Sequence, residues 1–174
     1  MMTMYPDVPI RRVNPDAPIP AYAYEGDAGL DLCSMEDVTL RPGESAKVGC
    51  GIAFAIPRGW VGYVYARSGL GMRGLVMKNG TGVVDSTYRG EVKLTLFNNN
   101  PTHVWRESEG PTFGSKTLDL MTNFDGTIHV RKGDRVAQIV FQQVGQATLA
   151  EVDELDETER GHGGFGSTGV GERL

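Results

Sequence analysis

The chain has 174 residues, enough for one domain with a sizeable hydrophobic core. Its net charge of −5 argues against a nucleic-acid-binding surface, and its two cysteines are too few for a disulfide scaffold or a zinc site. No apolar run approaches the length of a membrane span, and the first residues lack the charged and apolar regions of a signal peptide. We therefore expect a cytoplasmic protein, in the host cytoplasm if its source is a virus, without nucleic-acid or membrane partners.

Short apolar runs alternate with turn clusters along most of the chain. The 24 glycines indicate many turns, and residues 91–96 alternate apolar and polar side chains with the period of a half-buried strand. The runs expected to form strands are 8–13, 38–40, 46–56, 60–67, 91–97, 127–130, 135–144 and 148–152. Only residues 68–72 suggest a helical turn, and Cys33 and Cys50 are expected to be buried free thiols. The prediction is an all-β fold of the sandwich, jelly-roll or barrel type.

Two segments interrupt this rhythm. Residues 98–125 form a polar connection longer than compact domains usually contain, so we expect it to be functional or disordered. Residues 151–159 are rich in Asp and Glu, whose mutual repulsion keeps a tether extended. The expected organisation is a β domain over residues 1–150 followed by a linker and arm over residues 151–174.

The arm ends in a glycine-rich stretch, residues 160–169, that also contains Arg160, Phe165, Ser167 and Thr168. Glycines let backbone N–H groups approach phosphate oxygens, and a guanidinium group adds a fork of donors matched to phosphate. A flat ring offers a stacking face. The composition therefore fits either a disordered tail or a mobile arm that closes over a nucleotide.

Two interior clusters combine glycine with charge. The first, Ala28-Gly29-Leu30-Asp31-Leu32, places a carboxylate between apolar neighbours, where a turn residue or a paired surface charge is the ordinary interpretation. The second, Arg67-Ser68-Gly69, ends an apolar run with a guanidinium and a hydroxyl beside a glycine turn. Such a group suits a phosphate cradle and equally a simple capped turn.

The third cluster, residues 79–90, is the richest. Asp85 directly follows an apolar pair, so we expect it at a strand end that faces a cleft, where a carboxylate can orient and deprotonate a water molecule. Tyr88 offers a packing face, and Asn79 offers an amide for the edge of a base. Taken alone, Asp-Ser-Thr-Tyr would be an ordinary turn.

Taken in order, five clusters resemble the motifs of trimeric deoxyuridine triphosphatases (dUTPases). They are Ala28-Gly29-Leu30-Asp31-Leu32, Arg67-Ser68-Gly69, Gly82-Val83-Val84-Asp85-Ser86-Thr87-Tyr88-Arg89-Gly90, Gly133-Asp134-Arg135-Val136-Ala137-Gln138 and the stretch from Arg160 to Gly169. The resemblance implies a jelly-roll homotrimer whose active sites are shared between subunits. It also implies Mg²⁺-dependent cleavage of dUTP into dUMP and pyrophosphate, which limits uracil incorporation into DNA and supplies dUMP for thymidylate synthesis.

The resemblance assigns roles by motif position. Asp85 would activate the attacking water, Tyr88 would pack on the deoxyribose and Asn79 would pair with uracil. Asp31 would hold the metal through water. The remaining residues implied to bind substrate are Gly82, Val84, Arg67, Ser68, Gly69, Gln138, Arg160, Phe165, Gly166, Ser167 and Thr168. Among these, Phe165 would cover the uracil, and Arg160, Ser167 and Thr168 would grip the β and γ phosphates.

Residues 98–125 stand where the family usually has a short hairpin connection. The segment either packs on the enzyme or binds a regulatory protein partner. Its apolar residues are Trp105, Phe113, Leu118, Leu120, Met121 and Phe124. Of the rival functions, a dCTP deaminase is disfavoured, because the strand after the third motif offers Lys93-Leu94-Thr95-Leu96 and no carboxylate. A regulatory protein that uses dUTP as a signal remains an alternative.

Overall fold

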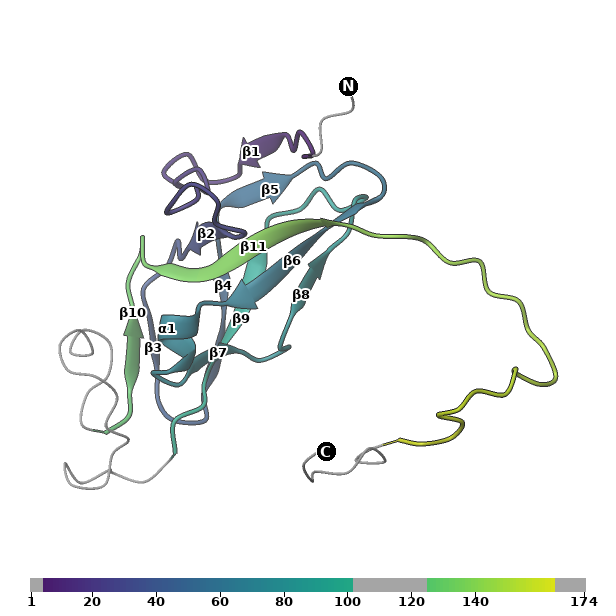
Figure 1. The fold of residues 1–174 in the computed structure, drawn as a ribbon. Coiled ribbons are helices and arrows are strands. Elements are labelled where there is room, and N and C mark those ends of the chain that lie inside the picture. Colours follow the sequence, from purple (N-terminus) through teal and green to yellow (C-terminus); the bar gives the residue numbers. More distant parts are fainter. Residues whose placement is uncertain (1–4, 102–124, 165–174) are drawn as a thin grey trace.

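The computed structural model describes residues 5–101 and 125–164, and within these ranges the chain is built almost entirely of antiparallel strands (Figure 1). The elements are β1 (Ile10–Arg12), β2 (Leu30–Cys33), β3 (Val38–Leu40), β4 (Ser45–Gly49), β5 (Ile52–Phe54), β6 (Trp60–Ala66), α1 (Ser68–Gly71), β7 (Leu75–Met77), β8 (Gly82–Val84), β9 (Lys93–Asn98), β10 (Ile128–Val130) and β11 (Arg135–Gln143). The predicted all-β fold is confirmed, as is the helical turn that follows β6. No helix in the described ranges is long and apolar enough to cross a membrane.

The largest sheet has the strand order β2-β11-β6-β8, and a second sheet has the order β4-β9-β7. Two further pairs, β1 with β5 and β3 with β10, complete the pairing among the described residues. In the largest sheet the long strand β11 lies between β2 and β6, so segments from the beginning, middle and end of the chain become neighbours (Figure 1). β8 forms one edge of this sheet and β2 forms the other.

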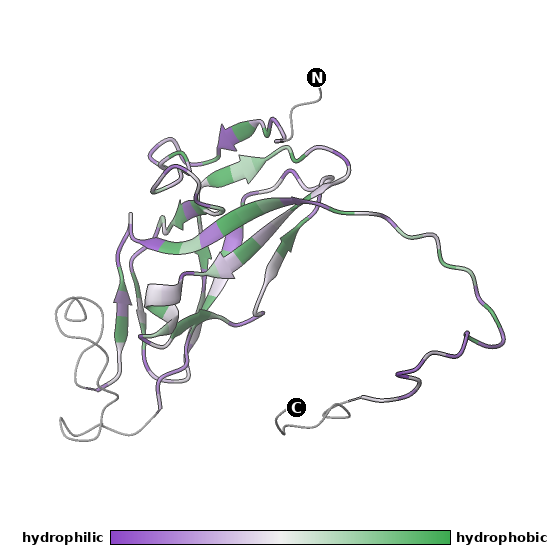
Figure 2. Ribbon diagram, in the orientation of Figure 1, coloured by the Kyte–Doolittle hydropathy of each residue, from purple (hydrophilic) through white to green (hydrophobic). Residues whose placement is uncertain are grey.

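The core follows from the alternation that the sequence shows. In β9, Leu94 and Leu96 are buried while Lys93 faces solvent, which confirms the predicted period of two. Hydrophobic residues occupy nearly every strand (Figure 2), and side chains from both larger sheets join one buried cluster. Each fully buried Leu or Ile contributes about 1.5–3 kcal/mol to folding.

Several predicted boundaries were wrong. The run 46–56 is split into β4 and β5, because Gly51 adopts a φ of +68° that turns the chain between them. Residues 148–152 form no strand: they are exposed and pair with nothing in the described part of the chain. A β-prone sequence needs a neighbouring strand before it becomes one. Cys50 is a buried free thiol as predicted, whereas Cys33 is only half-buried.

A clasp of polar residues closes the base of the 98–125 segment. Asn98 is fully buried, and its Nδ2 donates hydrogen bonds to the carbonyls of Leu40 and Gly126, both at 2.8 Å. Its Oδ1 accepts a hydrogen bond from the backbone N–H of Asn100 at 3.0 Å. Residues 102–124, with all the apolar side chains proposed for a partner surface, lie outside the described residues.

Candidate active site

Arginine and aspartate side chains line a cleft of about 610 Å³ at the ends of β2, β6 and β11. We call it the arginine cleft. Its polar lining residues are Asp27, Asp31, Arg67, Ser68, Arg73, Asp134, Arg135 and Gln138, joined by Gly29 and Gly69. The cleft thus gathers residues from three of the five sequence clusters, as their resemblance to one family implies.

Strand register explains why these residues meet. Gln138 in β11 stands opposite Asp31 in β2, so the two side chains lie on one face of the sheet. Gly29 leaves room for Gln138, since a Cβ at position 29 would lie 2.6 Å from the Gln138 Oε1. Arg67 directly follows β6, the strand on the other side of β11.

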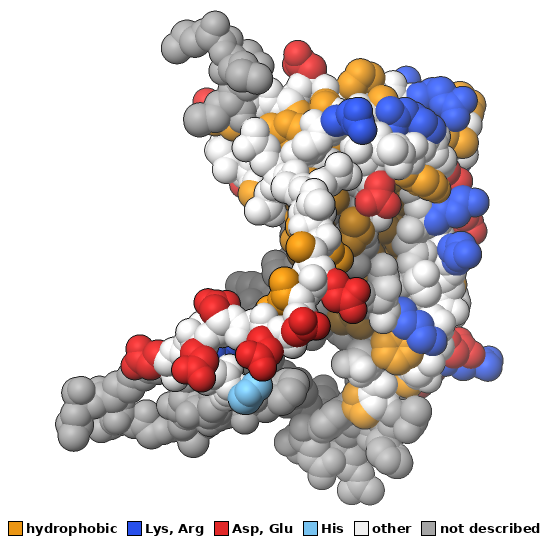
Figure 3. Space-filling model, turned by 90° about the vertical axis from the view of Figure 1, so that its right-hand side faces the viewer, with side chains coloured by type: hydrophobic (Ala, Val, Ile, Leu, Met, Phe, Trp, Pro, Cys, Tyr) orange, Lys and Arg blue, Asp and Glu red, His pale blue; other side chains and the backbone are white. Residues whose placement is uncertain are grey.

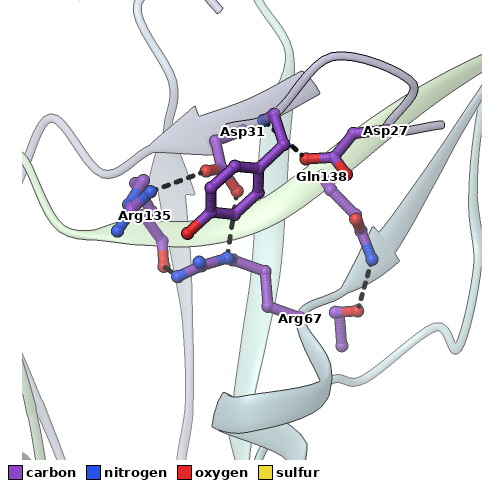
Figure 4. A network of polar contacts seen from close by, with 7 residues as sticks. Asp27, Asp31, Arg67, Arg135 and Gln138 are labelled. Atoms are coloured by element: carbon purple, nitrogen blue, oxygen red, sulfur yellow. Dashed lines mark hydrogen bonds and ion pairs between the residues drawn. The ribbon is translucent and has the colours of Figure 1, made fainter. Parts of the chain in front are cut away.

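Asp31 is the centre of the arginine cleft. Its Oδ1 is 3.0 Å from the Nε of Arg67, and its Oδ2 is 3.1 Å from the guanidinium Nη1 of Arg135 (Figure 4). Arg67 also donates to the carbonyl of Arg135 at 3.0 Å. The Asp31 side chain is only 17% exposed, so a carboxylate here holds two guanidinium groups in fixed positions. The alternative that Asp31 is a paired charge is therefore correct, and it lies in a strand rather than a turn.

A second cleft, of about 250 Å³, opens beside β8. We call it the Asp85 cleft. Its lining includes Asn79, Gly82, Val84, Asp85, Tyr88, Glu91 and Lys93. Asp85 comes directly after β8, which confirms the prediction of a carboxylate at a strand end that faces a cleft.

Hydrogen bonds fix the floor of the Asp85 cleft. The hydroxyl of Tyr88 donates to the carbonyl of Glu91 at 2.9 Å, and the Glu91 Oε1 accepts from the N–H of Gly51 at 2.8 Å. Gly90 makes room for the tyrosine ring, because a Cβ there would lie 2.6 Å from the Tyr88 Cζ. Tyr88 is 46% exposed and lines the cleft, so its side chain is accessible to a ligand there.

Asp85 differs from Asp31 in its contacts. Within the described residues its side chain forms no ion pair and no hydrogen bond, and it is exposed to solvent. An ionised carboxylate has two oxygens that accept hydrogen bonds from water. Asp85 is therefore available to orient a water molecule and to take its proton.

The two clefts share no lining residue. Gly62 of β6 pairs with Val84 of β8, so Asp85 lies level with Val61, near the start of β6, whereas Arg67 follows its end. With about 3.3 Å of advance per residue, the backbones of Asp85 and Arg67 are about 20 Å apart along β6. One copy of the chain therefore holds the two halves of the expected site at a distance that no single reacting group spans.

Comparisons with known proteins decide the family. A family model described as dUTPase matches residues 15–105 and 119–169. The chain belongs to the dUTPase family. It is 45% identical to the deoxyuridine 5'-triphosphate nucleotidohydrolase of Thermobifida fusca, over 93% of this chain and 78% of the relative.

Solved dUTPase structures have the same fold. The dUTPase of Staphylococcus bacteriophage 80alpha, solved with dUPNHPP, matches with a TM-score of 0.76 at 29% identity, over 94% of this chain and 99% of that one. A mutant dUTPase from phage phi11 of S. aureus, in which the coordination of a structural Mg(II) ion is described, matches with a TM-score of 0.68 at 30% identity. That match covers 86% of this chain and 98% of the phage protein.

The fifth motif of this dUTPase is only partly described. The Nε of Arg160 donates to the carbonyl of Gly163 at 2.9 Å, a local contact within the arm. Phe165, Gly166, Ser167 and Thr168 lie outside the described residues. Residues 145–164 form no hydrogen bond or ion pair with the β domain among the described contacts. They leave the β domain after β11 and then bend back below it (Figure 1).

Charge is divided unevenly between the arm and the β domain. Seven of the 22 Asp and Glu residues lie beyond residue 150, together with only Arg160 and Arg173 of the 17 Lys and Arg residues, so residues 151–174 carry the whole net charge of −5. Figure 3 shows acidic side chains along the arm and basic ones on the body. The β domain of this dUTPase is itself neutral.

Sequence reasoning missed two arginines of the arginine cleft. Arg135 was recognised only as part of a motif, yet it forms an ion pair with Asp31. Arg73 received no role, yet it lines the cleft beside Ser68 and Gly69. The signal that could have found Arg135 is its position three residues before Gln138, at the start of the same strand. Arg73 follows a helical turn whose path is not readable from sequence.

Proposed function

We propose that this dUTPase, which hydrolyses dUTP to dUMP and pyrophosphate, works as a homotrimer in which the Asp85 cleft of one copy faces the arginine cleft of another. The distance of about 20 Å between Asp85 and Arg67 within one chain carries this proposal. A water held by Asp85 cannot attack a phosphate held by Arg67 of the same copy. Closed rotational symmetry gives every copy both a donor and an acceptor face.

In the Asp85 cleft, Asn79 pairs with uracil, and Tyr88 packs on the deoxyribose where a 2′-hydroxyl would need room. Gly82 and Val84 complete the wall beside the nucleoside. Asp85 accepts a proton as a water oxygen bonds to the α-phosphorus. The bond from the α-phosphorus to the bridging oxygen breaks, and its electron pair leaves with the pyrophosphate. A general base of this kind contributes about 10²–10⁴-fold to the rate.

In the arginine cleft, Arg67, Ser68, Gly69 and Gln138 bind the phosphate chain. Donors that are already fixed in place stabilise charge as it develops on the leaving group without reorganising. The two ion pairs of Asp31 supply this fixation, because they hold Arg67 and Arg135 at 3.0 and 3.1 Å before substrate arrives. The carboxylate thus acts on the phosphates through the arginines.

The donor set of the arginine cleft fits Mg²⁺ that arrives with the nucleotide. Mg²⁺ prefers oxygen ligands, keeps several waters and commonly binds through carboxylates and substrate phosphates. Each oxygen of Asp31 uses one guanidinium partner, which leaves lone pairs that can accept hydrogen bonds from metal-bound water. When bound, the ion would neutralise phosphate charge and polarise the phosphoryl oxygens.

The arm would complete the site. Arg160, Ser167 and Thr168 grip the β and γ phosphates, Gly166 lets the backbone approach them, and Phe165 covers the uracil. The exposed, extended path of residues 145–164 supports an arm that reaches beyond its own β domain. The role of residues 151–174 as a unit separate from residues 1–150, the regulatory partner for residues 98–125 and the cytoplasmic location remain predictions.

Pyrophosphate release from dUTP, dTTP, dCTP and UTP, with and without Mg²⁺, tests this function. We expect fast release from dUTP alone and only with Mg²⁺. Comparable release from UTP would contradict the role of Tyr88, and tight dUTP binding without turnover would favour a regulatory protein. Sedimentation of the active species distinguishes a trimer from a monomer.

A further inference from the structure

Arg73 lies on the loop between α1 and β7 and lines the arginine cleft, although none of the five family motifs includes it. We propose that Arg73 is a further phosphate-binding residue, which contacts the β or γ phosphate, and that Asn100 positions it. This proposal rests on the proposed function, because it takes the arginine cleft to hold the phosphate chain.

The arginine cleft brings Arg73 together with two further guanidinium groups, those of Arg67 and Arg135, which Asp31 holds in place. Arg73 follows the end of α1, whereas Ser68 and Gly69 form its beginning, and all three residues line the same cleft. A planar guanidinium with five N–H donors is suited to a tetrahedral phosphate group.

The backbone of Arg73 is held from two sides. Its N–H donates to the carbonyl of Leu70 at 2.9 Å, which closes the turn after α1. Its carbonyl accepts a hydrogen bond from the Nδ2 of Asn100 at 3.1 Å, and that amide also donates to the carbonyl of Gly126 at 3.2 Å. Arg73 is half-buried, so its stem is packed rather than free in solvent. These contacts fix the backbone position from which the Arg73 side chain extends.

Gly74, the residue after Arg73, also contacts the base of the 98–125 segment. The N–H of Asn99 donates to the carbonyl of Gly74 at 2.8 Å. Gly74 has a φ of +85°, and a Cβ there would collide with the side chain of Asn100. Gly74 therefore leaves the room that the Asn100 side chain occupies. The base of the 98–125 segment is thereby connected to a residue of the arginine cleft.

The division of substrate between the clefts predicts which phosphates Arg73 reaches. Asp85 acts at the α-phosphate, on the nucleoside side, so the arginine cleft receives the part that leaves as pyrophosphate. An Arg73 contact should therefore contribute to binding of a triphosphate and not to binding of dUMP. A purely structural role would change the affinity for both ligands alike.

The test compares Arg73→Gln with Arg58→Gln, a control on the exposed turn before β6 that lines neither cleft. Calorimetry would measure binding of dUMP and of a dUTP analogue with an imido bridge between the α and β phosphates. We expect Arg73→Gln to weaken analogue binding about tenfold or more, as loss of a charge-assisted hydrogen bond does, and to leave dUMP binding unchanged. Arg58→Gln should match the wild type for both ligands.

Two further variants keep the proposal open to contradiction if Arg73→Gln folds poorly. Arg73→Lys, which keeps the charge, should recover part of the affinity for the analogue. Asn100→Ala should weaken analogue binding in the same direction by a smaller factor, again without effect on dUMP. Equal weakening of both ligands, or no weakening, overturns the proposal. Failure of the wild type to release pyrophosphate from dUTP would instead overturn the proposed function.

Discussion

Asp31 and Asp85 are both carboxylates at the margins of one four-stranded sheet, yet their surroundings give them opposite uses. Asp31, on edge strand β2, is 17% exposed and bonded to two arginines. Asp85, directly after edge strand β8, is exposed and makes no ion pair or hydrogen bond in the described part of the chain. A carboxylate committed to two guanidinium groups positions them, whereas an unengaged carboxylate can accept a proton.

The same contrast applies to the clefts as wholes. The arginine cleft is a network of charges held in place before any ligand arrives, which suits a highly anionic phosphate chain. The Asp85 cleft is smaller, and it combines apolar side chains such as Val64 and Leu94 with the amide of Asn79 and the ring of Tyr88, which suits a base and a sugar. The two lie about 20 Å apart along β6, and the proposed function therefore pairs clefts from two copies of the chain.

The largest effect is expected at the unengaged carboxylate. Asp85→Asn removes the proton acceptor while keeping the shape of the side chain, so kcat should fall by about 10²–10⁴-fold with little change in affinity for the dUTP analogue. Pyrophosphate release and calorimetry measure the two quantities. Asp153→Asn, in the exposed arm, is the matched control. A kcat near that of the wild type would remove Asp85 from its role.

The arm should matter for turnover and not for folding. Deletion of residues 161–174 keeps Arg160 but removes Ser167 and Thr168, which are proposed to grip the phosphates, and Phe165, so turnover should fall at least about tenfold. Because residues 145–164 make no described hydrogen bond or ion pair with the β domain, the Tm should stay unchanged. An unchanged rate would show that the segment is an ordinary tail.

Two matched glycine substitutions should separate the clefts. In Gly29→Ala the new Cβ displaces Gln138, so KM for dUTP should rise about tenfold while the preference for dUTP over UTP stays as it was. In Gly90→Ala the new Cβ displaces the Tyr88 ring, so that preference should fall instead. Steady-state kinetics with both nucleotides compares them. Loss of discrimination in Gly29→Ala would contradict the division of roles.

The smallest effect concerns the two thiols, each of which lies near one cleft. Burial raises the pKa of Cys33, and the nearby Asp31 carboxylate raises it further. Burial, with a contribution from Glu91, raises the pKa of Cys50 to about 12. Asp31→Asn should lower the Cys33 pKa, increase its thiolate fraction at pH 8 and speed its alkylation a few-fold, while Cys50 stays unreactive.

Mass spectrometry after iodoacetamide treatment measures both alkylation rates. Asp16→Asn, which breaks only an exposed ion pair with Lys132, is the control and should leave the Cys33 rate unchanged. Slower alkylation of Cys33 in Asp31→Asn would mean that the freed arginines move and cover the thiol.

Short sequence patterns predicted those strands whose own residues show a clear alternation or apolar pair. The alternation in β9 and the apolar pair before Asp85 were enough to place a strand and a carboxylate at a cleft. The short strands β2 and β7 were missed as strands, since each is too short to show a period without its neighbours. Residues 148–152 have the composition of a strand but no partner, and composition cannot supply one.

The site followed the same division. Motif order identified Asp31, Arg67 and Gln138 as members of one site, but their contacts depend on the antiparallel register of β2, β11 and β6. The double ion pair of Asp31 with Arg67 and Arg135 joins residues far apart in sequence. Arg73 was missed because the predicted helical turn before it does not show that the loop after it meets Asn100, which is distant in the sequence.

Mixing two inactive variants tests the shared site most directly. Asp85→Asn chains and Arg67→Gln chains would be unfolded together, refolded in equal amounts and assayed for pyrophosphate release from dUTP. If each site takes Asp85 from one copy and Arg67 from another, random assembly leaves both residues intact in about a quarter of the sites, and activity should recover to about a quarter of the wild-type value. If both residues act within one chain, no site is intact and the mixture stays as inactive as its components.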